Sequence, residues 1–415
     1  YGEIFSLYVF GKIITVVGKE TSLEVISNHQ SFNFLKASFD VNIIIIPLST
    51  INIMEIWAGP KIRYIAYLLY QYNLFNGFNN RTIPLNLLFG RPDAFFENVK
   101  KVVRNELSND LGQYTNKIQD ALEKSISRYI GECKDQRCIK SPQLMLLQIV
   151  AIPAASIIVG EDLSNDEELI NTFANLTRDI IPALSLPPFL NFIHPSLHAN
   201  FFAFRLKYTG HLYKKHRQVI TDRIMQIIKQ RENKKEFGNT YEPPTNILQI
   251  FINLSDKDGL VDVEEVTDYI IDIIFAAIHT TSQTISSVLY EYGARPEYWN
   301  ELLEENKKIS CEIKDGCLTD QDVNKMVKLD SFIRETLRVW QPIVGLEHKA
   351  FNDSFTFSNG YQIPKGRNVL MDFVEIHGNH SDSNTFNGFQ HIEKNSRATK
   401  TGREYLAFGL GRHAC

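Results

Sequence analysis

Cysteine is scarce in this sequence, and its distribution excludes the common cysteine-built sites. The 415 residues contain five cysteines, at positions 133, 138, 311, 317 and 415. An odd and sparse set in so long a chain does not form a disulfide scaffold. Neither close pair, Cys133 with Cys138 or Cys311 with Cys317, has a histidine at metal-ligand spacing, so the sequence predicts no zinc site.

Long apolar runs and strong net charge are also missing. The most apolar run, IIIIPL at 43–48, is far shorter than the ~20 residues that a membrane-spanning helix needs. The net charge of −4 is too close to neutral to indicate a nucleic-acid partner. No signal-peptide pattern opens the chain, and its first residue, Tyr1, falls inside a strand pattern. We therefore expect a piece of a longer protein, truncated at both ends.

The sequence does contain a small β-rich start, a long helical body and a β-rich, then loop-rich, end. Residues 3–18 place β-branched and aromatic residues on both sides of Gly11-Lys12, which predicts a hairpin with its turn there. An Asn-Gly pair between apolar runs predicts a second hairpin within 355–373. Apolar residues at three-to-four spacing predict helices between these two regions. After two amphipathic segments that start near residue 92, these helices cover 141–160, 165–185, 200–232, 262–291, 296–308 and 320–340.

The middle of the long helix predicted at 262–291 carries the first candidate site, in the run FAAIHTTS. Ala276 and Ala277 are small enough to let a bulky group approach the helix, and His279 and Thr280 follow closely. A mid-helix threonine can also donate to the carbonyl one turn back. Taken alone, the run therefore favours a buried helix whose polar groups are satisfied locally.

The helix predicted at 320–340 carries the second, in KLDSFIRETLRVWQP. Glu335 and Arg338 are three residues apart and share one helix face. An exposed pair of this kind contributes only ~0–1 kcal/mol. The neighbouring Phe332 and Trp340 indicate burial, and a buried arginine has to be paired and fully hydrogen-bonded. From this motif alone, the sequence favours a solvated pair over a buried one.

The terminal run at 404–415, EYLAFGLGRHAC, is the third candidate. Its glycines predict a turn that brings backbone close to a ligand, and its two basic residues supply the positive charge that stabilises a thiolate. The residues concerned are Phe408, Gly409, Gly411, Arg412, His413 and Cys415.

Together and in this order, the three motifs resemble the haem-thiolate monooxygenases, the cytochromes P450, and especially fungal members. The gap of 55 residues from Thr280 to Glu335 and that of 77 from Arg338 to Cys415 are similar to those of the family. The resemblance covers essentially the whole chain, 1–415. It implies a mainly α fold with small β-sheets, in a single but incomplete P450 domain without the family's C-terminal helix and β region.

The resemblance implies haem b, iron protoporphyrin IX, with Cys415 as the thiolate ligand that favours O–O cleavage. It implies that Thr280 helps to deliver protons to oxygen, and that His279 joins this relay where many members have Asp or Glu. Glu335 and Arg338 are implied to tie their helix to the loop before the cysteine. The other residues implied to lie at the haem are Ala276, Ala277, Phe408, Gly409, Gly411 and Arg412, with His413 and His348 at its propionates.

Three residues beside these motifs are predicted to face the substrate: Phe275, Ile343 and Val344. Ordinary core packing would account for them equally well. The chain departs from the family in two further places. Gln390, in FNGFQH, stands where the family usually supplies an arginine to the Glu-Arg pair. The early Trp-x-x-x-Arg haem contact is missing, with Arg104 or Lys100 as candidate substitutes.

The implied reaction inserts one oxygen atom from O₂ into a lipophilic small molecule, such as a terpenoid, a sterol or a fatty-acid-like compound. Electrons come from NADPH through NADPH-cytochrome P450 reductase. The implied setting is fungal secondary metabolism at the cytosolic face of the endoplasmic reticulum membrane, held by an N-terminal anchor outside these residues. Two alternatives stay open: a degenerate, non-catalytic haem or lipid binder, and a haem-thiolate isomerase or dehydratase that needs no reductase.

Overall fold

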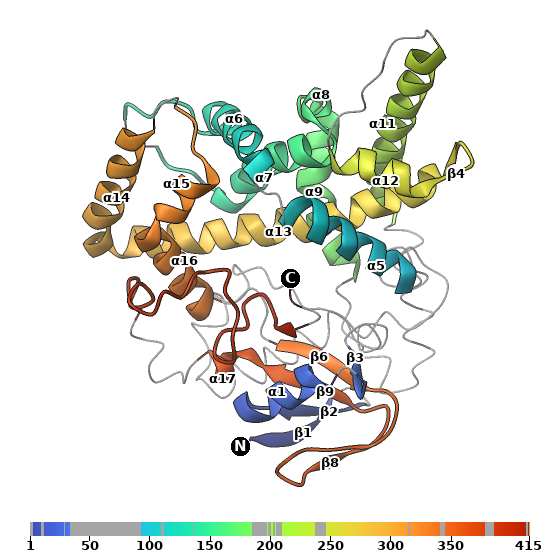
Figure 1. The fold of residues 1–415 in the computed structure, drawn as a ribbon, viewed down its shortest axis with the longest axis vertical. Helices are drawn as coiled ribbons and strands as arrows, with labels where there is room; N and C mark the ends of the chain where they lie inside the picture. The colour runs from blue at the N-terminus through green and yellow to red at the C-terminus, as the bar shows by residue number, and fades with distance from the viewer. Residues whose placement is uncertain are drawn as a thin grey trace.

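Helices fill one half of the molecule and a small β-sheet lies in the other (Figure 1). The mainly α fold with small sheets that the sequence predicts is confirmed. This computed structural model describes residues 3–9, 12–28, 30–33, 93–108, 112–135, 137–184, 210–236, 246–313, 316–340, 345–377 and 386–411, with the single residues 197, 201, 204 and 414.

The main sheet joins the two ends of the chain. Strands β1 (Ile4–Val9) and β2 (Lys12–Val17) form an antiparallel hairpin, and β2 pairs in parallel with β9 (Asn368–Asp372). Strand β6 (Gly345–Ala350) then lies between β9 and β3 (Phe32–Asn33). Strand β6, which follows the predicted Glu-x-x-Arg helix, thus belongs to the same sheet as the N-terminal hairpin.

Both predicted hairpins are present, with one correction. Lys12 pairs with Val9, so it belongs to β2 and not to the turn. This register leaves a connection of two residues, the commonest hairpin length, and Gly11 lies outside the described residues. In the second hairpin, β7 (Phe355–Thr356) pairs with β8 (Gln362–Ile363).

The helices of the described chain follow the predicted order. A π-helical turn (Val103–Ser108) extends α5, a 3₁₀ turn (Pro296–Tyr298) precedes α14, and the short strands β4 (Asp256–Lys257) and β5 (Leu260–Val261) precede α13. None of these helices is long and apolar enough to cross a membrane. They are α1 (Lys19–Ser27), α5 (Asp93–Val102), α6 (Gly112–Tyr129), α7 (Pro142–Ile158), α8 (Glu161–Ser164), α9 (Glu167–Leu184), α11 (His211–Glu236), α12 (Ile247–Ser255), α13 (Val263–Ala294), α14 (Trp299–Glu312), α15 (Asp320–Lys325), α16 (Val327–Val339) and α17 (Phe373–Ile376).

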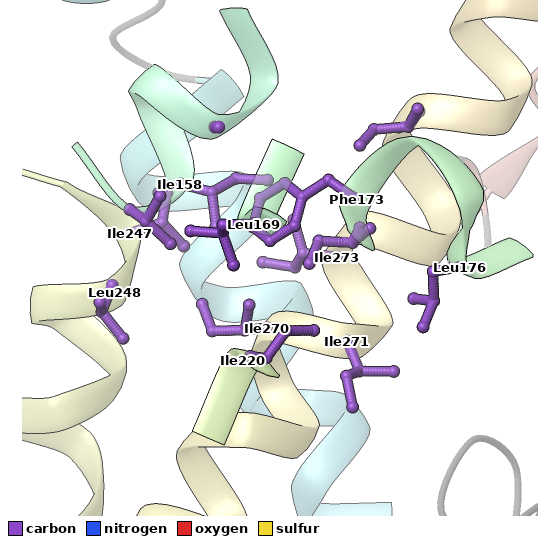
Figure 2. Close-up of a cluster of buried hydrophobic side chains, with 14 of the residues drawn as sticks. Ile158, Leu169, Phe173, Leu176, Ile220, Ile247, Leu248, Ile270, Ile271 and Ile273 are labelled. Carbon is purple, nitrogen blue, oxygen red and sulfur yellow. The ribbon is translucent and has the colours of Figure 1, made fainter. Parts of the chain in front are cut away.

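Helix α13 runs through the helical core. Its Ile270 and Ile273 pack among apolar side chains of α7, α9, α11 and α12, such as Leu169 and Phe173 (Figure 2). Burial of this kind contributes ~1.5–3 kcal/mol per large apolar side chain. The first half of α13 is thus anchored on several helices, which fixes where its middle lies.

The single helix predicted over 320–340 is wrong, because the chain breaks it at Met326, whose ψ of 62° is not helical. Each of the two resulting helices has its own N-terminal cap. A capping box between Thr319 and Asp322 begins α15. A carboxylate from α14, Glu305, then accepts the backbone N–H groups of Lys328 and Leu329 at 2.7 and 3.0 Å. The free amides of a new helix start are thereby satisfied.

Candidate functional site

The middle of α13 has one open face made of small residues. Ala276 and Thr281 are exposed, and Ala277, Thr280 and Thr284 are half-buried. Their spacing places all five on one side of the helix. Small, accessible side chains in the middle of an otherwise packed helix leave its surface open to a flat or bulky group.

The hydroxyl of Thr280 lies on this face and is bonded to its own helix. Its Oγ1 donates to the carbonyl of Ala276 at 2.6 Å, the local satisfaction that the sequence left open. Because a hydroxyl has one donor and two acceptor sites, Oγ1 can still accept a hydrogen bond. Thr280 therefore combines an accessible acceptor with an exchangeable proton.

His279 does not share this face, although it precedes Thr280 in sequence. Its side chain is buried, and neither ring nitrogen has a hydrogen-bond partner among the described residues. Burial lowers the pKa of His279 below its ordinary value, so the imidazole is neutral near neutral pH. The structure thus brings together Ala276, Ala277 and Thr280, but not the imidazole.

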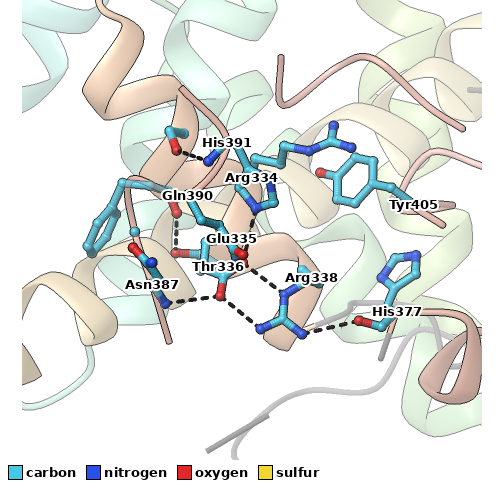
Figure 3. Close-up of polar contacts among 12 residues, drawn as sticks. Arg334, Glu335, Thr336, Arg338, His377, Asn387, Gln390, His391 and Tyr405 are labelled. Carbon is cyan, nitrogen blue, oxygen red and sulfur yellow. Dashed lines mark hydrogen bonds and ion pairs between the residues drawn. The ribbon is translucent and has the colours of Figure 1, made fainter. Parts of the chain in front are cut away.

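Glu335 of α16 is the centre of a buried polar network (Figure 3). Arg338 donates to both its carboxylate oxygens at 2.8 Å, a bidentate pair. On the other side, the backbone N–H of Asn387 and the side chains of Gln390 and His391 contact the same carboxylate at 3.1, 2.7 and 3.0 Å. Of the two alternatives left by the sequence, the buried pair is the one observed.

The network keeps Glu335 ionised. Burial by itself raises the pKa of this carboxyl group, but hydrogen bonds from Arg338 and His391 and from the N–H of Asn387 outweigh it. The pKa falls to about 2. Gln390 does not leave a gap at the position of the family's arginine, because its amide and the neighbouring imidazole both reach the carboxylate. A buried charge needs this degree of saturation to be tolerated.

Three more residues of α16 face the tail of the chain, and the sequence analysis missed them. Asp330 accepts the N–H of Ala398, and Ser331 accepts that of His391. Arg334 donates to two tail carbonyls, at positions 397 and 400, and lies 3.7 Å over the ring of Tyr405. A signal was available, because polar residues at 330, 331, 334, 335 and 338 follow helical spacing and define one face.

The same face reaches the start of the terminal run through His377. Arg338 donates to the carbonyl of His377 at 3.1 Å, and the His377 Nε2 accepts the N–H of Leu406 at 2.6 Å. Burial, followed by the charges of Arg338 and Arg334, lowers the pKa of His377 to about 3. The imidazole is therefore neutral, as an acceptor must be.

The remaining predicted site residues are partly accounted for. Phe408 is half-buried, Gly409 is buried and Gly411 is exposed, and both glycines have positive φ, 73° and 68°. His348 is buried on β6 and Phe275 is half-buried on α13. Five predicted residues lie outside the described residues: Arg412, His413, Cys415, Ile343 and Val344.

The described residues fit a haem on two sides. On α13, the exposed Ala276 and half-buried Ala277 leave room for a flat apolar ring beside Thr280. The terminal run is fastened to the sheet by Leu406 and Leu410, which pack on its apolar cluster. Figure 1 shows the last coloured segment of the chain between α13 and that sheet.

Comparison with known proteins gives one consistent result. The family model described as Cytochrome P450 matches residues 71–415. The fold is similar to that of a cyanobacterial CYP120A1 with bound retinoic acid, with a TM-score of 0.61 and 18% identity, over 100% of this chain and 80% of that one.

The similar curated proteins are fungal. Cytochrome P450 monooxygenase paxP of Penicillium paxilli is 24% identical over 76% of this chain and 62% of its own length. The monooxygenase AtmP of Aspergillus flavus is 24% identical over 81% and 67%. The monooxygenase ltmQ of Epichloe festucae var. lolii is 33% identical over 46% and 37%. The chain thus spans about two thirds or less of the length of these relatives.

Proposed function

The chain belongs to the cytochrome P450 family, and we propose from this that it acts as a haem-thiolate monooxygenase on a lipophilic small molecule. The observation that carries the proposal is the open face of α13, where Ala276, Ala277 and Thr280 are accessible in the middle of a packed helix. The relatives named above are fungal monooxygenases, which supports this reaction class.

Haem b, when bound, supplies oxygen activation and electron transfer, and the protein supplies binding, orientation and proton handling. We assign Cys415 as the iron ligand, flanked by the charges of Arg412 and His413. Ala276 and Ala277 would leave the helix surface clear for the ring.

Thr280 is the residue we assign to proton handling. Its Oγ1 can accept a hydrogen bond from the reaction side while its own hydrogen is held by the Ala276 carbonyl at 2.6 Å. A positioned proton donor contributes ~10²–10⁴-fold to rate. His279 is buried off this face, with no hydrogen-bond partner for either ring nitrogen among the described residues, so we assign it no part in this proton handling.

Glu335 and Arg338 take no part in the chemistry of this proposal. They hold the loop that precedes the cysteine, through the tail segment at 387–391 and the carbonyl of His377. Fixing that loop keeps the thiolate in place, because a metal ligand has to stay in one geometry.

The partners follow from the same proposal. The electrons come from NADPH through NADPH-cytochrome P450 reductase. The substrate is a terpenoid, sterol or fatty-acid-like compound, and the side chains that face it are those of Phe275, Ile343 and Val344. The enzyme works at the cytosolic face of the endoplasmic reticulum membrane in fungal secondary metabolism.

The test is spectroscopic. The chain is expressed with haem, reduced and exposed to carbon monoxide, and the red-shifted Soret band of a thiolate-ligated carbonyl complex is expected. Cys415→Ser should abolish that band, whereas Cys311→Ser, which changes an exposed free thiol, should leave it intact. A wild-type chain that binds haem without the red-shifted band contradicts the proposal.

Turnover then separates the alternatives. Product formation that requires NADPH and reductase supports the monooxygenase. Turnover without NADPH indicates an isomerase or dehydratase, and ligand-induced spectral changes without turnover indicate a non-catalytic binder.

A further inference from the structure

One buried hydrogen bond fixes the beginning of the terminal run. The N–H of Leu406 donates to Nε2 of His377 at 2.6 Å, and both residues are buried. The two partners are 29 residues apart in sequence. Acceptance at Nε2 requires a neutral ring with its proton on Nδ1.

The imidazole is held from several directions. Its ring stacks between those of Phe373 and Tyr405, with centroids at 6.1 and 5.4 Å (Figure 3 shows the Tyr405 side). Arg338 holds the carbonyl of the same residue. The charged groups that face it come from α16, namely Arg338, which is paired with Glu335, and Arg334 over Tyr405. Both arginines oppose protonation of the ring.

Leu406, held by His377, is also hydrogen-bonded to the loop that follows it. Its carbonyl accepts the N–H of Gly409 at 2.8 Å, and the carbonyl of Gly411 accepts that of Ala414 at 3.2 Å. One tight turn therefore starts at Leu406 and a second starts at Gly411, with positive φ at Gly409 and Gly411. Such bonds define tight turns, so the position of Leu406 constrains that of the described residues that follow it, up to Ala414, the neighbour of Cys415 in sequence.

We propose that His377 is a positioning residue for the thiolate ligand: by holding the N–H of Leu406, it sets the place from which Cys415 meets the haem iron. The role of Cys415 rests on the proposed function. In this role His377 acts through the loop, by its contact with Leu406.

The test compares three substitutions of His377 in the full chain. His377→Gln keeps an acceptor at a reach similar to that of Nε2, His377→Asn has an acceptor that is too short, and His377→Leu has none. Two quantities are measured. The first is the fraction of the reduced carbonyl complex with the red-shifted Soret band, and the second is hydrogen exchange of the Leu406 amide. A core variant with the same loss of stability, Ile220→Val or Ile220→Ala, serves as the control.

We expect His377→Leu and His377→Asn to lower the red-shifted fraction beyond the core control, and His377→Gln to restore it. The Leu406 amide should exchange roughly 5- to 100-fold faster in the Leu and Asn variants, as loss of one buried hydrogen bond predicts. A His377→Leu chain whose red-shifted fraction equals that of the core control overturns the proposal, as does a Gln variant that behaves like Leu.

The exchange measurement keeps the proposal falsifiable in two further cases. In the wild-type chain it requires no substitution, and a Leu406 amide that exchanges like an unprotected one overturns the proposal even when His377→Leu fails to fold. A wild-type chain without any red-shifted band refutes the role of Cys415 and hence the proposed function. In that case the hydrogen bond between His377 and Leu406 is tested separately. It is supported if the Leu406 amide exchanges slowly in the wild type and in His377→Gln but quickly in His377→Asn.

Discussion

Replacing Glu335 by glutamine should be among the most destabilising conservative substitutions in this chain. The change keeps the size of the side chain and removes one negative charge. It leaves Arg338 without its bidentate carboxylate, and it puts an amide against the donors of Gln390 and His391. A half-satisfied buried network is worse than none.

The size of the loss follows from the pKa of Glu335. The downward shift from 4.5 to about 2 corresponds to ~3 kcal/mol of folding free energy at neutral pH. Stranding the buried Arg338 brings the expected loss to ~3–5 kcal/mol. Because the pKa of Glu335 is lower in the folded chain than in the unfolded chain, its ionisation stabilises the fold. Its contribution is present above pH ~4.5 and is lost as the pH falls towards 2.

The assay is urea unfolding of the wild type and of Glu335→Gln between pH 7 and pH 3.5. Their difference in unfolding free energy should be constant above pH ~5 and should shrink by ~1.4 kcal/mol per pH unit below ~4.5. Glu404→Gln is the matched control. It makes the same change in an exposed ion pair with Lys19, which contributes ~0–1 kcal/mol.

Two results would refute this reasoning. One is a loss for Glu335→Gln that is no larger than that for Glu404→Gln. The other is a difference that does not change with pH, which would mean that the carboxylate is not ionised by the network described.

Three further outcomes are expected. His391→Ala should cost ~1.5–3 kcal/mol in urea unfolding, as loss of a hydrogen bond to a charged group does, and Gln390→Arg in the same chain should recover most of it; no recovery would argue against a shared role of these two positions. Because the pKa of His377 is lowered from 6.5 to about 3, its contribution to stability is full above pH ~6.5. It should fall by ~1.4 kcal/mol per pH unit below that, and His377→Gln should remove this slope between pH 7 and 5.5. Thr280→Val should reduce product formation by ~10²-fold, whereas Thr284→Val, one turn along the same face, should change it little; equal effects would count against the role of Thr280.

Local patterns predicted the fold wherever local interactions decide it. The hairpin of β1 and β2 and the amphipathic helices follow periods of two and 3.6 residues, which short windows of sequence contain. The break at Met326 could not be found in this way. Its stabilising acceptor, Glu305, belongs to α14 and meets α16 only in the folded chain. The parallel pairing of β2 with β9 is non-local for the same reason.

In the candidate site, too, contacts between residues close in sequence were predictable and contacts between distant residues were not. Glu335 and Arg338 are three residues apart, so helical geometry alone brings them together. His391 reaches Glu335 across 56 residues, and His377 reaches Leu406 across 29. No window of sequence contains either pair, and a histidine gives no sign of which ring nitrogen will be used. Gln390 contacts Glu335 together with the imidazole of His391, and the sequence motif contains no sign of that second contact.

The face of α16 that holds the tail acts mostly on backbone atoms, and this has a consequence for which substitutions the chain tolerates. Its side chains accept the N–H groups of 387, 391 and 398 and donate to the carbonyls of 377, 397 and 400. Backbone groups are the same for every residue type except proline, which lacks the N–H. In a mutational scan, the helix positions 330, 331, 334, 335 and 338 should therefore reject most changes. Position 387 of the tail, whose side chain is exposed, should accept most residues except proline, so family members can diverge there while the path of the tail is kept.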